Sequence, residues 1–170
     1  MSSSHRGPGL RGRRTEQAAL DRLLTEVRAG QSRVLVLRGE AGVGKTVLLD
    51  YVQERAPECR VVRAAGVESE MELPFAVLHQ LCAPLLNSLA RLPGPQGDAL
   101  STAFGLGAGA APDRFIVSLA VLGLLSVVAE ERPLVCLVDD TMARPGFCAG
   151  ACVRRAPPLG GIGRHDLLAA

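Results

Sequence analysis

A glycine-rich segment, residues 39–46, lies between two apolar segments and leaves few folds open to this chain. Residues 34–37 are all Val or Leu, a run that is typical of a strand buried on both faces. Residues 47–54 have the spacing of a helix, with Leu48, Leu49 and Val52 facing inward. A strand, a tight glycine-rich turn and a helix in this order predict an α/β fold with a parallel sheet.

The glycine-rich segment matches the pattern G-x-x-x-x-G-K-[S/T] of phosphate-binding loops. Glycines permit positive φ angles and the close approach of a phosphate, and the helix N-terminus attracts the anion. Lys45, the only lysine in the chain, is expected to reach the β- and γ-phosphates of ATP, and the Thr46 hydroxyl to bind Mg²⁺. The alternative is a glycine-rich turn that ends in Lys-Thr by chance. The residues predicted to bind the nucleotide are Gly39, Ala41, Gly42, Val43, Gly44, Lys45 and Thr46.

A second apolar run, residues 134–138, ends in the acidic pair Asp139 and Asp140. Asp139 is expected to hold Mg²⁺ through water, and Asp140 to orient or deprotonate the water that attacks the γ-phosphate. An apolar strand that ends in two aspartates is weak evidence by itself, and a plain strand end is the alternative. Its position downstream of a phosphate loop favours the metal-binding and catalytic interpretation.

The segment before the first expected helix is basic. Arg13 is predicted to bind the nucleotide, as part of a segment that packs near the adenine. The alternative is a basic tail that leads into a helix capped by Thr15. Two other groups of side chains are weak candidates for a metal site. The first lacks a fourth ligand and the usual zinc spacing, and the second is better explained as solvated helix ends and a surface histidine. These groups are Cys148, Cys152 and His165, and the set Glu68, Glu70, Glu72 and His79.

Charge and composition exclude several classes of protein. Residues 1–14 contain four Arg and no acid, and residues 141–170 carry +3, so the total of +2 leaves −5 for residues 15–140. That body lacks the basic footprint of a DNA- or RNA-binding surface, and a content of 3% aromatic residues argues against stacking on bases. The longest uncharged run, residues 115–129, is shorter than the roughly 20 residues of a membrane span and predicts a buried core helix. Without a secretory signal, the expected location is the cytoplasm.

The remaining elements follow from apolar spacing and turn residues. We expect a flexible leader over residues 1–9 and no regular element in residues 141–170. Gly30 is expected to end the first helix, and Asp113 to cap the long apolar one. The expected helices begin at residue 15 and span 47–54, 73–92, 97–104 and 113–130, and the expected strands span 33–38, 60–65 and 134–138.

Several motifs, taken in order, resemble one known family. They are Gly12-Arg13-x-x-Glu16, the phosphate loop, Ser69-Glu70-x-x-Leu73-Pro74-Phe75-Ala76-x-Leu78-His79-x-Leu81, Ala111-Pro112-Asp113-Arg114-Phe115 and Val138-Asp139-Asp140. Over residues 10–140 the chain resembles the N-terminal ATPase module of the large ATP-binding LuxR-type transcriptional regulators, which belong to the STAND group of AAA-like P-loop ATPases. The resemblance implies a three-layer α/β fold, ATP and Mg²⁺ as ligands, and regulation of transcription. The helix-turn-helix of the family is absent here, so no direct DNA binding is expected.

The resemblance stops after Asp140. The family continues with a Gln-Trp-Leu-Asp type of segment, whereas this chain reads Thr141, Met142, Ala143, Arg144. Codons for residues 141–156 can be chosen so that a neighbouring reading frame encodes the family's continuation. We therefore predict a frameshift after Asp140, which would make residues 10–140 a truncated ATPase domain and residues 141–170 an irregular, out-of-frame tail.

The resemblance also predicts the consequences of such a truncation. In the family, the strand with the phosphate loop and the strand with Asp139 are not neighbours, and the strand between them would follow Asp140. We therefore expect an incomplete three-layer α/β P-loop domain of low stability, with sheet edges through which chains could self-associate. The expected function is ATP binding by a regulatory module with little turnover. The alternatives are a remnant or interaction module that binds no nucleotide and, less favoured, a small P-loop kinase.

Overall fold

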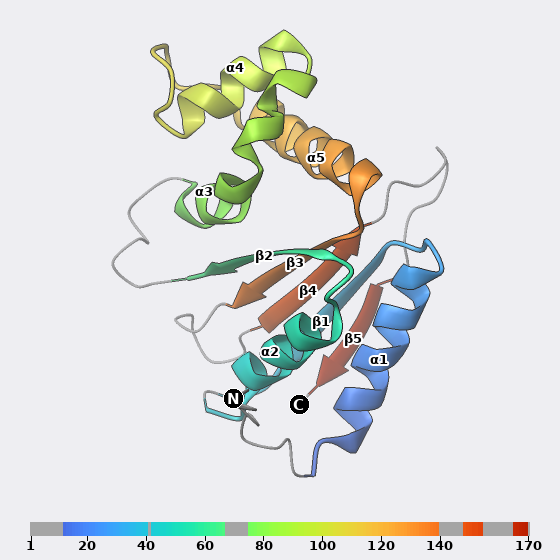
Figure 1. The fold of residues 1–170 in the computed structure, drawn as a ribbon. Helices are drawn as coiled ribbons and strands as arrows, with labels where there is room; N and C mark the ends of the chain where they lie inside the picture. The colour runs from blue at the N-terminus through green and yellow to red at the C-terminus, as the bar shows by residue number, and fades with distance from the viewer. Residues whose placement is uncertain (1–11, 41, 67–74, 140–147, 155–164, 170) are drawn as a thin grey trace, which may run out of the picture.

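A sheet, with five strands among the residues that the structure describes, forms the centre of the chain (Figure 1). The computed structural model describes residues 12–40, 42–66, 75–139, 148–154 and 165–169. The strands are β1 (Arg33–Arg38), β2 (Arg60–Ala65), β3 (Leu134–Asp139), β4 (Cys148–Arg154) and β5 (His165–Ala169). Their order across the sheet is β2-β3-β4-β1-β5. The strands predicted over 33–38 and 60–65 are confirmed with the same bounds, and the predicted strand 134–138 extends by one residue to Asp139.

Four of the five strands run in the same direction. β2 pairs with β3 and β1 pairs with β5 in parallel, whereas β4 is antiparallel to both of its neighbours, β3 and β1. Val36 of β1 and Val138 of β3 share the same partner on β4, Gly150, so these two strands are level with each other. The carboxyl ends of β1, β2 and β3 therefore lie at one edge of the sheet. The expected parallel sheet is confirmed for these strands and is wrong for β4.

The expectation that no strand lies between the strand of the phosphate loop and the strand of Asp139 is wrong. β1 and β3 are not neighbours, as expected, but the place between them is taken by β4, which belongs to residues 141–170. β5 of the same segment covers the outer edge of β1. The expectation of no regular element in this segment is also wrong. The strands on either side of β4 offer unpaired N–H and C=O groups, and hydrogen bonds to these groups stabilise a strand even in a segment without a clear apolar pattern.

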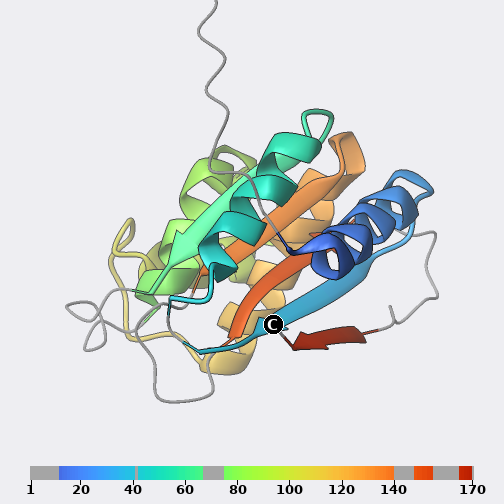
Figure 2. The same cartoon turned by 90° about the horizontal axis from the view of Figure 1, so that it is seen from below.

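Two helices cover one face of the sheet. These are α1 (Arg14–Arg28) and α2 (Lys45–Arg55), and Figure 2 shows them on the same side of β1 and β3. Gly30 ends the α1 segment as expected, with φ +89°. The predicted cap at Thr15 is wrong, because α1 begins one residue earlier, after Arg13. The buried residues that α1, α2 and the sheet share on this side are Leu20, Leu23, Leu24, Val27, Leu35, Leu37, Leu48, Leu49, Val52, Ala56, Cys59, Val135 and Leu137.

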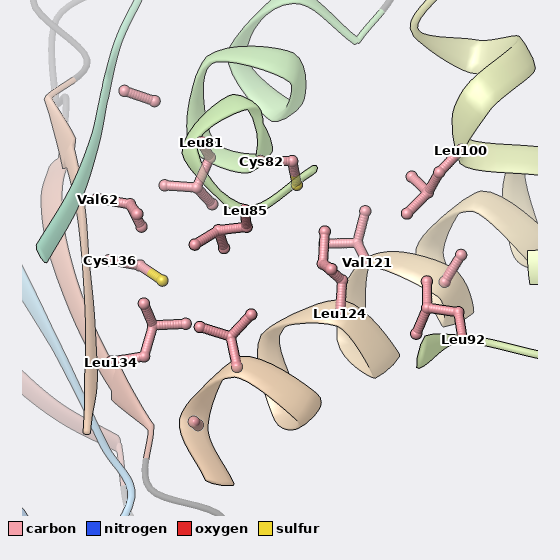
Figure 3. Packing of buried hydrophobic residues seen from close by; sticks show 14 of the residues in the cluster. Val62, Leu81, Cys82, Leu85, Leu92, Leu100, Val121, Leu124, Leu134 and Cys136 are labelled. Carbon is pink, nitrogen blue, oxygen red and sulfur yellow. The ribbon is translucent and has the colours of Figure 1, made fainter. Parts of the chain in front are cut away.

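The other face is covered by the elements between β2 and β3. They are α3 (Ala76–Cys82), the 3₁₀ helix η2 (Ala83–Arg91), α4 (Gly94–Ala103) and α5 (Arg114–Glu131). Figure 3 shows how Leu81 and Leu85 meet Val62 and Cys136 of the sheet, while Val121 and Leu124 of α5 lie between them and Leu100. Asp113 caps α5 as predicted, since its side chain accepts a hydrogen bond from the Phe115 amide.

Two expectations about these helices need correction. The single helix expected over 73–92 is two elements, because Pro84 lacks an N–H and its ring clashes with the preceding turn, so the α-helix gives way to a 3₁₀ helix. The apolar helix α5 is buried on one face only. Phe115 is 73% exposed, and Leu122 is 53% exposed. No helix within the described part of the chain is long and apolar enough to cross a membrane.

Candidate nucleotide-binding site

The glycine-rich loop connects β1 to α2, and its backbone has the shape that the sequence pattern requires. Gly42 and Gly44 adopt φ angles of +81° and +89°, a region that glycine enters without strain. Gly44 is the N-cap of α2, and its carbonyl accepts the first helical hydrogen bond, from the Leu48 amide at 3.3 Å. The loop therefore ends at a helix N-terminus, whose N–H groups and dipole favour an anion. Ala41 lies outside the described residues.

The Lys45 side chain folds back across the loop. Its Nζ donates hydrogen bonds to the carbonyl oxygens of Gly39 at 2.9 Å and Glu40 at 2.8 Å. An ammonium group has three N–H donors. The third can bind a phosphate oxygen, and the two that bind carbonyls can exchange those partners for phosphate oxygens. Thr46 follows in the first turn of α2 and is exposed. The cation and the hydroxyl predicted from the sequence thus lie at the loop itself.

Arg13 also contacts the loop, from the N-cap of α1. Its guanidinium donates to the Val43 carbonyl oxygen and, at 2.9 Å, to Oε1 of Glu16. The pKa of Glu16 is lowered, first by a backbone hydrogen bond at Glu16 and then by the hydrogen bond from Arg13. The structure therefore brings the Gly12-Arg13-x-x-Glu16 motif to the phosphate loop. Its expected position near the adenine remains a prediction.

Asp139 lies at the carboxyl end of β3, at the same sheet edge as the loop. The residue is 3% exposed, and its Oδ2 accepts a hydrogen bond from Arg63 at 3.2 Å. Its Oδ1 is buried and has no hydrogen-bond partner among the residues that the structure describes. A buried carboxylate oxygen without a donor is costly, so this atom is suited to bind a metal-bound water. Asp140 lies outside the described residues, and its catalytic role remains a prediction.

Sequence reasoning missed two residues of this site, Arg63 and Asp50. Arg63 interrupts the apolar pattern of β2, and its guanidinium pairs with Asp139 and, at 2.5 Å, with Asp50 of α2. The hydrogen bond with Asp50 is the largest cause of a raised pKa for Arg63. An arginine in the middle of a short, half-buried strand was the available signal, because a partly buried charge favours an acidic partner.

The oxygen ligands fit Mg²⁺. The Thr46 hydroxyl and Oδ1 of Asp139 are hard oxygen donors, and Mg²⁺ commonly uses few protein ligands together with phosphates and water. Within the described ranges, no group of three or more His, Cys, Asp or Glu side chains is placed to hold a metal. Of the other groups considered, residues 68, 70 and 72 lie outside those ranges, as do the side chains of Cys148, Cys152 and His165. The His79 ring instead packs edge-on against Phe104 at 5.1 Å.

Residues 9–143 match the family model described as the AAA ATPase domain. The chain belongs to the AAA ATPase domain family. The match includes the phosphate loop and Asp139, so this AAA ATPase domain is a nucleotide-binding, ATPase-like module for which Mg²⁺ is the usual metal. No curated protein and no solved structure matches the chain.

Proposed function

We propose that this AAA ATPase domain binds Mg²⁺·ATP as the regulatory module of a LuxR-type transcriptional regulator of the STAND group. It does so in the cytoplasm, through a three-layer P-loop fold, and makes no direct contact with DNA. The observation that supports nucleotide binding most strongly is the loop from Gly39 to Thr46, with two glycines at positive φ, a helix N-terminus and the Lys45 ammonium on one small surface.

The residues of the site have separate tasks. The loop amides and Lys45 bind the phosphates, and Lys45 exchanges its contacts with Gly39 and Glu40 for phosphate oxygens. Thr46 and Asp139 hold Mg²⁺, which when bound neutralises charge on the phosphates. Asp140 orients the attacking water. Because the charge of the ligand is met by local dipoles and one ammonium, a body of net charge −5 can bind a polyanion.

A direct binding measurement tests this function. The dissociation constant of a fluorescent ATP analogue is measured for the wild-type chain and for Lys45→Ala. We expect Lys45→Ala to weaken binding at least about tenfold, because a charge-assisted hydrogen bond to phosphate is worth about 1.5–3 kcal/mol. Arg22→Ala, an exposed change on α1, is the matched control and should bind as the wild type does.

Two results would contradict the proposal. If the folded wild-type chain binds no nucleotide, the alternative of an interaction module or remnant without nucleotide binding is correct. If the Lys45→Ala and Arg22→Ala variants bind equally well, the glycine-rich segment is only a turn. The regulatory role needs a separate observation: the DNA that follows the codon for Asp140 should encode, in a neighbouring frame, the continuation of a LuxR-type regulator.

A further inference from the structure

Arg63 connects three elements of the site. It lies on β2, its Nη2 donates to Oδ2 of Asp139 on β3 at 3.2 Å, and its Nη1 donates to Oδ1 of Asp50 on α2 at 2.5 Å. Side chains of residues 61, 135 and 137 pack on the α1 and α2 side of the sheet. Arg63 and Asp139 each lie two residues after one of them on the same strand, so they belong to the same face. The guanidinium therefore spans from the sheet to the helix that begins at the phosphate loop.

The position of Asp50 makes this connection relevant to the metal. Asp50 is four residues after Thr46 on α2, so the two side chains lie on the same face of the helix, one turn apart. Arg63 thus links the helix face that carries Thr46 to the buried carboxylate of Asp139. These are the two residues of the described chain that are assigned to Mg²⁺ in the proposed function.

The contact occupies one oxygen of Asp139, and within the described ranges the other oxygen has no hydrogen-bond partner. The carboxylate side chain is 4% exposed, and a buried polar group of this kind requires a hydrogen-bond partner, which also holds it in one rotamer. The planar guanidinium of Arg63 provides it at Oδ2, whereas Oδ1 has no partner among the described residues. The carboxylate is thereby held with a single oxygen available to a metal or its water.

We propose that Arg63 is a positioning residue for Mg²⁺, which holds the Asp139 carboxylate so that its free oxygen and Thr46 bind the ion together. Arg63 does not contact the nucleotide in this role. The inference rests on the proposed function, because it assigns the metal to Thr46 and Asp139. Partners that orient a metal-binding carboxylate commonly change metal affinity by about ten- to a hundredfold when they are removed.

The test separates binding of the nucleotide from binding of the metal. The dissociation constant of the fluorescent ATP analogue is measured with excess Mg²⁺ and again with EDTA, and the ratio of the two constants gives the gain that Mg²⁺ provides. We expect Arg63→Gln to reduce this gain about tenfold and to leave the EDTA constant nearly unchanged. Arg63→Lys keeps a cation that cannot reach both carboxylates well, and should lie between Arg63→Gln and the wild type.

Two further variants test whether the effect is specific to the Arg63 ion pairs. Asp50→Asn loosens the anchor of Arg63 and should reduce the Mg²⁺ gain less than Arg63→Gln does. Arg60→Gln changes an arginine at the opposite end of the same strand and should leave the gain unchanged. Melting temperatures identify variants that do not fold, and if Arg63→Gln is one of them, Arg63→Lys and Asp50→Asn supply the result.

Different results would contradict the proposed function and the positioning role of Arg63. If the wild-type chain binds no nucleotide under either condition, the proposed function fails. If it binds nucleotide and all folded Arg63 and Asp50 variants retain the full Mg²⁺ gain, the ion pairs are merely structural and the inference alone is wrong. An increased gain in Arg63→Gln would also overturn it, since it would mean that Arg63 competes with the metal for Asp139.

Discussion

The guanidinium of Arg13 donates a hydrogen bond to the carbonyl oxygen of Val43, in the middle of the phosphate loop. The contact joins the N-cap of α1 to a loop thirty residues later in the sequence. A second donor of Arg13 reaches Glu16, so the guanidinium is oriented by α1 itself. The carbonyl of Val43 is thereby turned toward Arg13, which constrains the conformation of the loop.

Replacing Arg13 should loosen the loop. We expect Arg13→Ala to weaken ATP binding several-fold and to lower stability by about 1 kcal/mol, because hydrogen bonds to charged groups contribute about 1.5–3 kcal/mol and this one is partly exposed. Arg14→Ala removes the exposed neighbouring arginine and should change neither quantity. ATP titration and urea unfolding of both variants provide the measurement. Equal affinities for the two variants would mean that the Arg13–Val43 contact does not shape the loop.

Gly44 should be sensitive to substitution for a conformational reason. Its φ is +89°, and a Cβ added there meets nothing within 4 Å, so Gly44→Ala strains the backbone without a steric clash. We expect a loss of about 1–2 kcal/mol in stability, together with weaker ATP binding. Gly94→Ala is the matched control: the site is equally open, lies at the start of α4 and has no positive φ. Thermal unfolding should show a lower midpoint for Gly44→Ala only.

Turnover of ATP should be slow. Hydrolysis requires a cation on the γ-phosphate in the transition state, and such a group is worth about 10³–10⁵ in rate where it is supplied as an arginine finger. In the described part of the chain, Arg13 and Arg63 are engaged with Val43, Asp50 and Asp139. We expect phosphate release near background, and Asp140→Asn to change it little. Steady multiple-turnover hydrolysis that Asp140→Asn abolishes would show that the site is complete.

The cap of α5 should contribute to stability and not to binding. Asp113 accepts a hydrogen bond of 2.7 Å from the Phe115 amide at the start of the helix. Asp113→Ala should lower stability by about 1 kcal/mol, whereas Asp113→Ser keeps an oxygen acceptor and should lose less. Chemical denaturation checks the order of the three proteins. Equal stability of Asp113→Ala and the wild type would show that the cap contributes nothing.

Cys82 should react slowly with alkylating reagents. The residue is fully buried, and burial raises the pKa of its thiol to about 11. At pH 8 the thiolate fraction in the folded chain is then about one in a thousand, against about one in ten for a thiol of pKa 9. Peptide mapping after brief iodoacetamide treatment should find Cys82 modified in urea and protected in buffer. Rapid labelling in buffer would mean that α3 and η2 open readily.

The raised pKa of Cys82 also determines how the free energy of unfolding changes with pH. The protonated thiol is favoured by the fold, so its contribution is fully present below the pKa of the unfolded chain, about 9, and is lost as pH rises through about 11. Glu16 has the opposite sign. Its lowered pKa contributes stability above the ordinary value of 4.5, which is lost as pH falls through the lower folded value.

The local elements of this chain could be predicted from sequence alone. The bounds of β1 and β2, the stop at Gly30, the cap at Asp113 and the glycine-rich loop depend on nearby residues and on backbone preferences. Apolar runs, glycine and capping residues act over a few positions, so their physical effect is readable without the fold. The same holds for Lys45, whose partners in the structure are only five and six residues away.

Features that depend on partners far along the chain became visible only in the fold. β4 is a strand because β1 and β3 leave a place between them, and its own residues carry little pattern. Arg63 is a site residue because the register of β2 and β3 places it opposite Leu137, from where its side chain reaches Asp139, 76 residues later in the sequence. Sequence determined the phosphate-binding loop through local backbone chemistry. Only the fold determined which charges surround it, since the energy of a buried charge depends on the groups that packing brings near.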